Sequence, residues 1–154
     1  MNLFGLMETS GSAMQAERMR AEIVAANMAN AETTRTEAGG PYKRQHVIFA
    51  ANAPDGEFAQ TLAGASGGGI GSENEEPAGG VHIAAVFEDN QPALKRYDPG
   101  HPDAGPDGYV AYPDISPVTE MVDLMGATRA YGLNSSAVQA EKGMITSALD
   151  IAKS

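Results

Sequence analysis

The sequence predicts a mainly α protein with a small β insert, in which long N- and C-terminal helices pair as an α-helical coiled coil around a Gly/Pro-rich, β-hairpin-like middle segment. All nine prolines of the 154-residue chain lie from Pro41 to Pro117, and thirteen of its eighteen glycines lie from Gly39 to Gly108. All eight methionines lie outside that stretch. Because proline and glycine disfavour helix interiors, only the two ends can form long helices.

This partition divides one elongated subunit into three parts. Residues 1–38 form an N-terminal axial helix, residues 39–116 form the Gly/Pro-rich β and loop insert, and residues 117–154 form a C-terminal axial helix. Such helices are long against the mean of about 11 to 12 residues in globular proteins. A compact helical bundle is the alternative interpretation of the same pattern.

The N-terminal helix is predicted from Leu3 to about Glu32, before the stop signal Gly39-Gly40-Pro41. Alternating spacings of four and three residues define an apolar stripe that is typical of helix pairing. The stripe consists of Leu3, Met7, Ser10, Met14, Glu17, Ala21, Val24, Met28 and Ala31. We expect its members Leu3, Met7, Met14, Ala21, Val24 and Met28 to form an assembly interface.

The C-terminal helix is predicted to begin at Pro117, with Ser116 as its N-cap and Glu120 near the positive end of the helix dipole. Its stripe consists of Met121, Leu124, Thr128, Tyr131, Ser135, Val138, Lys142, Ile145, Leu149 and Ala152. We expect the interface to include Met121, Leu124, Tyr131, Val138, Ile145 and Leu149. Gly126, Gly132 and Gly143 weaken this helix, so packing must stabilise it.

The middle segment contains four strand-like runs. Two span residues 42–49 and 81–88, and shorter ones span 94–97 and 108–112. Residues 64–77 combine glycines with an acidic run and are predicted to form a flexible loop, to which the sequence assigns no role.

Composition excludes several classes of protein. The absence of cysteine excludes disulfide scaffolds and thiolate metal sites. The net charge is -10, and the middle segment, with four basic and eleven acidic residues, carries -7 of it, which argues against nucleic-acid binding. No apolar run reaches the roughly 18 to 20 residues of a membrane span. The first residues lack a basic region and a long apolar core, so we expect no cleaved signal peptide.

The sequence contains no convincing catalytic, cofactor or metal site. The glycine run lacks the lysine and the following helix of a phosphate-binding loop, and no nucleophile elbow is present. Asp98, His101 and Asp103 could bind a divalent metal, but a turn whose aspartates cap backbone amides is favoured there. We therefore expect no enzymatic activity, no cofactor and no small-molecule substrate.

Three stretches resemble the bacterial flagellar basal-body rod protein family, with its C-type proximal rod members the most similar. The first covers 10–18 and 26–36 and carries an Asn-x-x-Asn-x-x-Thr pattern at Asn27, Asn30 and Thr33, which rod and hook proteins share. The second joins 98–103 to 108–113 and resembles a segment peculiar to the C type. The third runs from 120 through 131 to 134 and resembles the C-terminal helix of that type. The motif residues of the second stretch are Pro99, Gly100, His101, Pro102, Tyr112 and Pro113.

The resemblance implies a structural subunit of the proximal rod, the drive shaft that transmits torque and supports flagellum assembly and motility. It implies other rod proteins, copies of the chain itself, the rod-base adaptor protein, the membrane-embedded ring and the flagellar type III export apparatus as partners. It also implies a periplasmic position in the basal body, reached without a cleaved signal. A soluble coiled-coil adaptor or export chaperone is the alternative function. A metal-dependent enzyme at the 98–103 turn is a third hypothesis.

Overall fold

The computed structural model describes residues 3–52 and 79–153, and the predicted loop at 64–77 lies outside these residues. The described chain is mainly α with a small β insert, as predicted. Its elements are α1 (Leu3–Ala29), β1 (Gln45–Ala51), β2 (Val81–Glu88), β3 (Leu94–Tyr97), β4 (Tyr109–Tyr112) and α3 (Pro117–Lys153). In the part of the chain described, no helix is long and apolar enough to cross a membrane.

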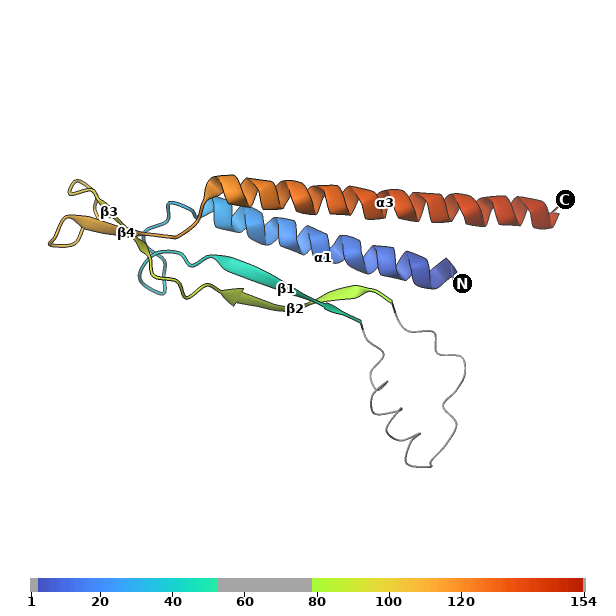
Figure 1. Cartoon of the computed structure of the whole chain (residues 1–154), viewed down its shortest axis with the longest axis horizontal. Coiled ribbons are helices and arrows are strands. Elements are labelled where there is room, and N and C mark those ends of the chain that lie inside the picture. The colour runs from blue at the N-terminus through green and yellow to red at the C-terminus, as the bar shows by residue number, and fades with distance from the viewer. Residues whose placement is uncertain (1–2, 53–78, 154) are drawn as a thin grey trace, which may run out of the picture.

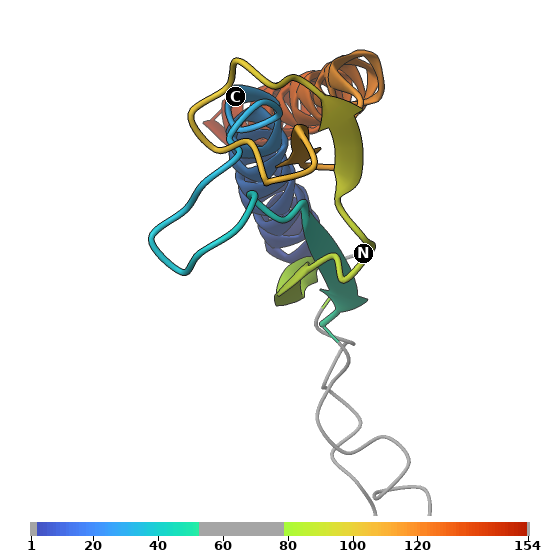
Figure 2. The ribbon, with the colours of Figure 1, turned by 90° about the vertical axis from the view of Figure 1, so that its left-hand side faces the viewer.

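The two helices lie side by side and run in opposite directions along an elongated molecule (Figure 1). Helix α1 lies between α3 and the β1–β2 hairpin and contacts both (Figure 2). The 37-residue α3 extends past the start of the 27-residue α1, while the β3–β4 hairpin lies at the opposite end of the molecule. Helix α1 ends three residues before the predicted boundary at residue 32.

The four strands form two separate antiparallel hairpins. In the first, Gln45 pairs with Glu88 and Ala51 with Val81, and the register shifts between Ile48 and Phe49. In the second, β3 pairs with β4. Both short strands and β2 match the predicted runs closely, whereas β1 begins at residue 45 rather than 42. A two-stranded hairpin is marginal alone in water, so contact with α1 supports the β1–β2 hairpin.

The interior of the described chain is small and partly polar. Its buried apolar residues are Ala16, Ile23, Val24, Val110, Ile115 and Ala127. Its buried polar residues are Ser10, Asn27, Glu120 and Glu141. Small and polar side chains therefore occupy the helix–helix contact, while many of the larger apolar side chains lie on the surface.

Gly80 brings the start of β2 close against α1. Its backbone has φ +126°, and a Cβ atom there would lie 2.6 Å from the Ser12 Oγ that accepts the Val81 N–H. We expect Gly80→Ala to lower the unfolding free energy by about 1–3 kcal/mol, because the backbone is strained for an L residue and Ser12 must move. Thermal unfolding followed by circular dichroism measures this.

Gly126→Ala is the matched control for that substitution. A Cβ atom at Gly126 would meet nothing within 4 Å, and the residue lies in the interior of α3. Alanine should therefore stabilise the helix by up to about 1 kcal/mol. A Gly80→Ala chain as stable as the parent would contradict the close approach.

Candidate functional site

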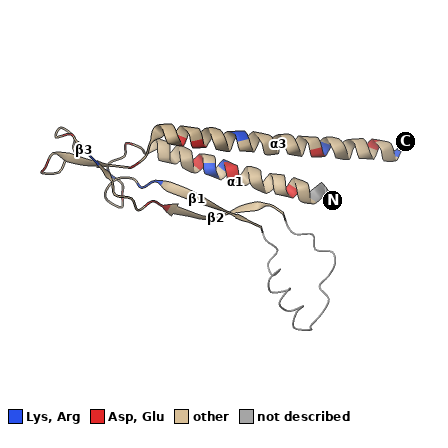
Figure 3. Cartoon of the chain, viewed as in Figure 1, with Lys and Arg blue, Asp and Glu red and all other residues tan. Residues whose placement is uncertain are grey.

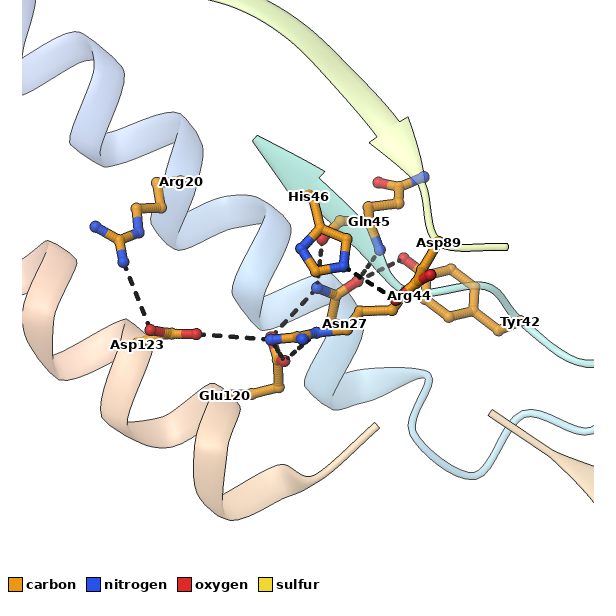
Figure 4. A network of polar contacts seen from close by, with 9 residues as sticks. All are labelled: Arg20, Asn27, Tyr42, Arg44, Gln45, His46, Asp89, Glu120 and Asp123. Carbon is orange, nitrogen blue, oxygen red and sulfur yellow. Dashed lines mark hydrogen bonds and ion pairs between the residues drawn. The ribbon is translucent and has the colours of Figure 1, made fainter. Parts of the chain in front are cut away.

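Helix α1 is joined to the start of β1 by the side chain of Asn27, which is 1% exposed. Its Nδ2 donates to the Gln45 carbonyl oxygen at 2.9 Å, and its Oδ1 accepts from the Gln45 backbone N–H at 2.9 Å (Figure 4). The amide thus pairs with the strand as a peptide group of a neighbouring strand would. This pairing fixes where the hairpin leaves the helix pair.

Glu120, in the first turn of α3, links the same asparagine to an arginine. Its Oε1 accepts from Arg44 Nε at 2.7 Å and lies 2.6 Å from Arg44 Nη2, and its Oε2 accepts from Asn27 Nδ2 at 3.2 Å. Glu120 is 1% exposed, so its charge needs these donors. Its place near the N-terminus of α3 adds a favourable helix dipole. We call Asn27, Tyr42, Arg44, Gln45 and Glu120 the polar hub.

Tyr42 completes the polar hub from the loop that precedes β1. Its hydroxyl donates to Asn27 Oδ1 at 3.2 Å. Burial, with smaller contributions from the negative charges of Glu88 and Glu120, raises the pKa of Tyr42 above its ordinary value of 10.0. The phenol therefore stays protonated at neutral pH and keeps its donor role.

The polar contacts between α1 and α3 weaken with distance from the polar hub. Asp123 lies 3.6 Å from Arg44 and 3.5 Å from Arg20, which are ionic distances between half-buried groups. Further along, Ser10 Oγ donates to Glu141 Oε1 over a long 3.5 Å, and Glu141 Oε2 has no hydrogen-bond partner among the described residues. Glu141 is 2% exposed and has no nearby cation comparable to Arg44 in the described chain.

The family-motif residues at the end of α1 close that helix. Asn30 Nδ2 donates to the Ala26 carbonyl oxygen at 2.9 Å, and Thr33 Oγ1 donates to Asn30 Oδ1 at 3.1 Å. The Thr33 carbonyl oxygen then accepts the backbone N–H of Tyr42 at 3.0 Å. The Asn-x-x-Asn-x-x-Thr pattern therefore directs the chain from α1 back toward the polar hub.

The turn at 98–103 connects the β3–β4 hairpin to the loop after α1. Asp98 Oδ1 accepts from the Gly100 backbone N–H at 3.3 Å, which confirms the predicted backbone capping for Asp98. Asp103 accepts from Thr34 Oγ1 at 2.8 Å and lies 3.6 Å from Arg35. Both carboxylates thus have protein partners, and the described residues contain no cluster of three metal-ligating side chains.

The remaining motif residues of this segment pack around the second hairpin. The His101 ring stands edge-on to Tyr112, with centroids 6.1 Å apart, and Arg96 lies over the Tyr112 ring at 4.4 Å. Pro113 is buried next to the hairpin. These contacts and the intervening Pro99, Gly100 and Pro102 give the turn a fixed shape.

The residues expected at an assembly interface differ in exposure within one chain. Val24 is buried in α1, and Leu3 begins that helix. Met121, Tyr131 and Leu149 are exposed at 54%, 44% and 54%. The half-buried members are Met7, Met14, Ala21, Met28, Leu124, Val138 and Ile145.

The residues of α3 that pack on α1 are not those of the predicted stripe. The buried residues of α3 are Glu120, Ala127 and Glu141, each one position before a stripe residue. Leu124, Val138 and Ile145 are half-buried; they belong to the predicted stripe and also lie on the side of α3 that carries Glu120, Ala127 and Glu141. The predicted stripe includes the charged residue Lys142, which is exposed, whereas the structure buries Glu120 and Glu141 against α1.

Large apolar side chains are instead on the opposite side of α3. Val118, Val122, Met125 and Leu133 are 74%, 64%, 68% and 67% exposed. With Arg129 between the last two, they recur at the spacing of one helix face. We call these five residues the outer face of α3. Figure 3 shows how few charged residues α3 carries along its length.

Sequence reasoning did not find the central members of the polar hub. The sequence marks Glu120 only as a favourable charge in the first helical turn, and Arg44 only as part of a strand-like run. They are separated by 76 residues, so no local pattern could pair them. The signal that was available is Asn27 within an otherwise small-residue helix, since a buried amide requires partners.

Comparison with known proteins agrees with this architecture at both ends of the chain. Residues 7–35 match the family description "Flagella basal body rod protein", and residues 107–151 match "Flagellar basal body rod FlgEFG protein C-terminal". The chain is 38% identical to the flagellar basal-body rod protein FlgC of Borreliella burgdorferi, with 98% of each chain covered. It is 36% identical to FlgC of Bacillus subtilis, over 99% of this chain and all of the relative.

This chain belongs to the flagellar basal-body rod protein family, FlgC type. A third relative, FlgC of Salmonella typhimurium, is 31% identical over 98% of both chains. The family is structural and non-enzymatic, so this rod protein is a structural subunit of the flagellar basal-body rod that serves motility. The predicted family is thereby confirmed, and the polar hub is interpreted as scaffold rather than as an active site.

Proposed function

We propose that this rod protein is a subunit of the proximal rod and that its exposed helix faces are buried against neighbouring rod subunits. The observation that carries the proposal is the distribution of side chains on α3: glutamates and alanine face α1, and valine, methionine and leucine face away. In a protein that functions as a monomer, the large apolar side chains would face α1 and the glutamates would face solvent.

The energetics support contacts between subunits along this surface. Burying one large apolar side chain contributes roughly 1.5–3 kcal/mol relative to leaving it exposed. Val118, Val122, Met125 and Leu133 alone offer several such contributions per subunit. Methionine also adapts its shape to neighbours that are not equivalent, as in a stack of different rod proteins.

In the assembled rod, α1 and α3 pair as a coiled coil and transmit torque along the axis. The stripe residues Met14, Val138 and Ile145 are half-buried in the single chain, so neighbouring helices can complete their burial. The β1–β2 and β3–β4 hairpins, held by the polar hub and by the 98–103 turn, set the position of the subunit among its neighbours.

The partners that we propose are other rod proteins, further copies of this chain, the rod-base adaptor protein and the membrane-embedded ring. Export by the flagellar type III apparatus, without a cleaved signal peptide, delivers the chain to the periplasmic rod. These proposals rest on the family resemblance and on the largely uncharged outer face of α3, which suits protein contacts.

Deletion of the gene with complementation tests this function. We expect the deletion strain to lack hooks and to be non-motile, and the full chain expressed in it to restore both. Basal bodies isolated from the complemented strain should contain the chain. Recovery of the chain only from the soluble fraction, or hooks in the deletion strain, would contradict the proposed place in the proximal rod.

A further inference from the structure

Met125 is the most exposed of the methionines that the structure describes. It is 68% exposed, and the next are Met121, Met144 and Met19, at 54%, 52% and 42%. The half-buried ones are Met7, Met14 and Met28. Because the chain contains no cysteine, methionine supplies its only sulfur atoms. Among the described methionines, an oxidant that reacts with sulfur therefore finds its most accessible target at Met125.

Met125 also lies in the middle of the outer face of α3. Val122 precedes it and Leu133 follows it, at 64% and 67% exposed, and Arg129 is the one polar member of this face. Met125 is the only residue of the face that contains sulfur. A chemical change at this one sulfur therefore changes the polarity of a surface that is otherwise apolar around a single cation.

Hydrogen peroxide converts methionine to its sulfoxide. A lone pair of the sulfur attacks one oxygen of the peroxide, the O–O bond breaks, and that oxygen stays on the sulfur while the other leaves as water. The sulfur loses two electrons and the peroxide gains them. A flexible apolar side chain thereby becomes polar and acquires an acceptor oxygen. Arg129 lies one helical turn after Met125, so its guanidinium can donate to that oxygen in the free chain.

The sulfoxide would oppose burial of the outer face. A buried acceptor oxygen needs a donor, and the side chains of Val118, Val122 and Leu133 offer none. Covering a sulfoxide that is bonded to Arg129 would remove both polar groups from water. Oxidation before assembly should thus disfavour burial of this face, whichever rod subunit covers it.

We propose that Met125 is an oxidation site that peroxide modifies in the free chain, and that its sulfoxide keeps the subunit out of the rod. Once the outer face of α3 is buried, peroxide no longer reaches the sulfur, and the assembled subunit is protected. This inference rests on the proposed function, which buries that face, and adds a covalent modification that acts on the free subunit.

Peptide mapping by mass spectrometry tests the site. The purified full chain is treated with a limiting amount of hydrogen peroxide, and the gain of one oxygen is measured at each methionine. Met125 should be oxidised at least about threefold faster than the half-buried Met14. In the chain unfolded by guanidinium, the two rates should converge. A folded chain in which Met125 reacts no faster than Met14 would overturn the assignment of the site.

Isolated basal bodies test the protection. Isotope-labelled free chain is added to them, so that both forms meet the same peroxide and are told apart by mass. Met125 of the rod-bound chain should react at least about threefold more slowly than Met125 of the labelled free chain. Equal rates would contradict burial of the outer face of α3, and thus the proposed function, even where Met125 is the fastest site of the free chain.

Two substitutions test the effect on assembly. Met125→Gln imitates the sulfoxide, since glutamine keeps the unbranched shape and adds a polar oxygen, whereas Met125→Leu keeps an apolar side chain of similar volume without sulfur. Basal bodies should contain about tenfold less of the Met125→Gln chain than of the Met125→Leu chain, because the amide would be buried without partners. Circular dichroism should show the same fold for both.

Met144→Gln is the matched control, since Met144 is also exposed but lies on a different side of α3. It should enter basal bodies as the parent does. Equal incorporation of Met125→Gln and Met125→Leu would overturn the block to assembly, and an equal loss with Met144→Gln would overturn its assignment to the outer face. Either result leaves the rod function standing. Absence of the parent chain from basal bodies would refute the proposed function itself.

Discussion

Substituting Met125→Asp and Leu133→Asp together is expected to abolish swimming while leaving the fold of the chain intact. Both side chains are about two-thirds exposed, at 68% and 67%, so neither substitution removes a packed group from the chain's interior. In the assembled rod, each aspartate would place a carboxylate in an apolar contact, where burial of an unpaired charge is strongly unfavourable. The loss should therefore appear at assembly and not in folding.

Two measurements separate these stages. Circular dichroism of the purified double variant should match the parent, and motility agar should show no swimming ring. Thr128→Asp is the matched control, since Thr128 lies on α3 between the two sites and is exposed on a different side of the helix. Normal swimming of the double variant would refute burial of the outer face of α3. Loss of helical structure in the purified double variant would contradict the exposure of Met125 and Leu133 in the single chain.

Replacing Glu120 with alanine is expected to produce the largest loss of stability of any single substitution in the chain. The change removes the acceptor for Arg44 and one acceptor for Asn27, and leaves the guanidinium half-buried without its closest anion. Removing one partner of a buried pair typically costs about 3–5 kcal/mol, and we expect the lower end because the Arg44 side chain is 26% exposed. Urea titration followed by the helical circular-dichroism signal measures this loss of unfolding free energy.

Glu141→Gln is the control that separates the effect of hydrogen-bond donors around a buried glutamate from the effect of burial itself. Glu141 is as deeply buried as Glu120, but its only described donor is Ser10, at 3.5 Å. Removing its charge should be neutral or stabilising, because an unpaired buried carboxylate is costly. Equal destabilisation by Glu120→Gln and Glu141→Gln would show that hydrogen-bond partners do not distinguish the two sites.

The helices and strands were largely predictable because their signals are local. Pro117 after Ser116 marks the start of α3, and the alternation in 81–88 marks β2. The end of α1 was placed three residues late, because Asn30 and Thr33 form their own hydrogen bonds there and turn the chain. Local side-chain bonding of this kind competes with helix, and periodicity does not reveal it.

The polar hub could not be predicted, because its members come from α1, the loop before β1, β1 itself and α3. Apolar periodicity favoured Met121 as a seam residue over its neighbour Glu120, since a buried glutamate is rare without a cation. The cation is Arg44, which lies next to Gln45 and is positioned beside α3 by the Asn27–Gln45 pairing. The buried frame of α3 is thus set by a tertiary contact that a helical pattern does not contain.

The polar hub lies at one end of the helix pair and holds α1 and α3 together there. At the polar hub, α1 and α3 are held by charge-assisted bonds, whereas at their far ends the long Ser10–Glu141 bond is the only polar side-chain contact between them among the described residues. Amide hydrogen exchange should therefore accelerate steadily from Asn27 toward the start of α1. We expect the far ends of the two helices to separate more readily than the ends at the polar hub, which keeps the hairpins in place.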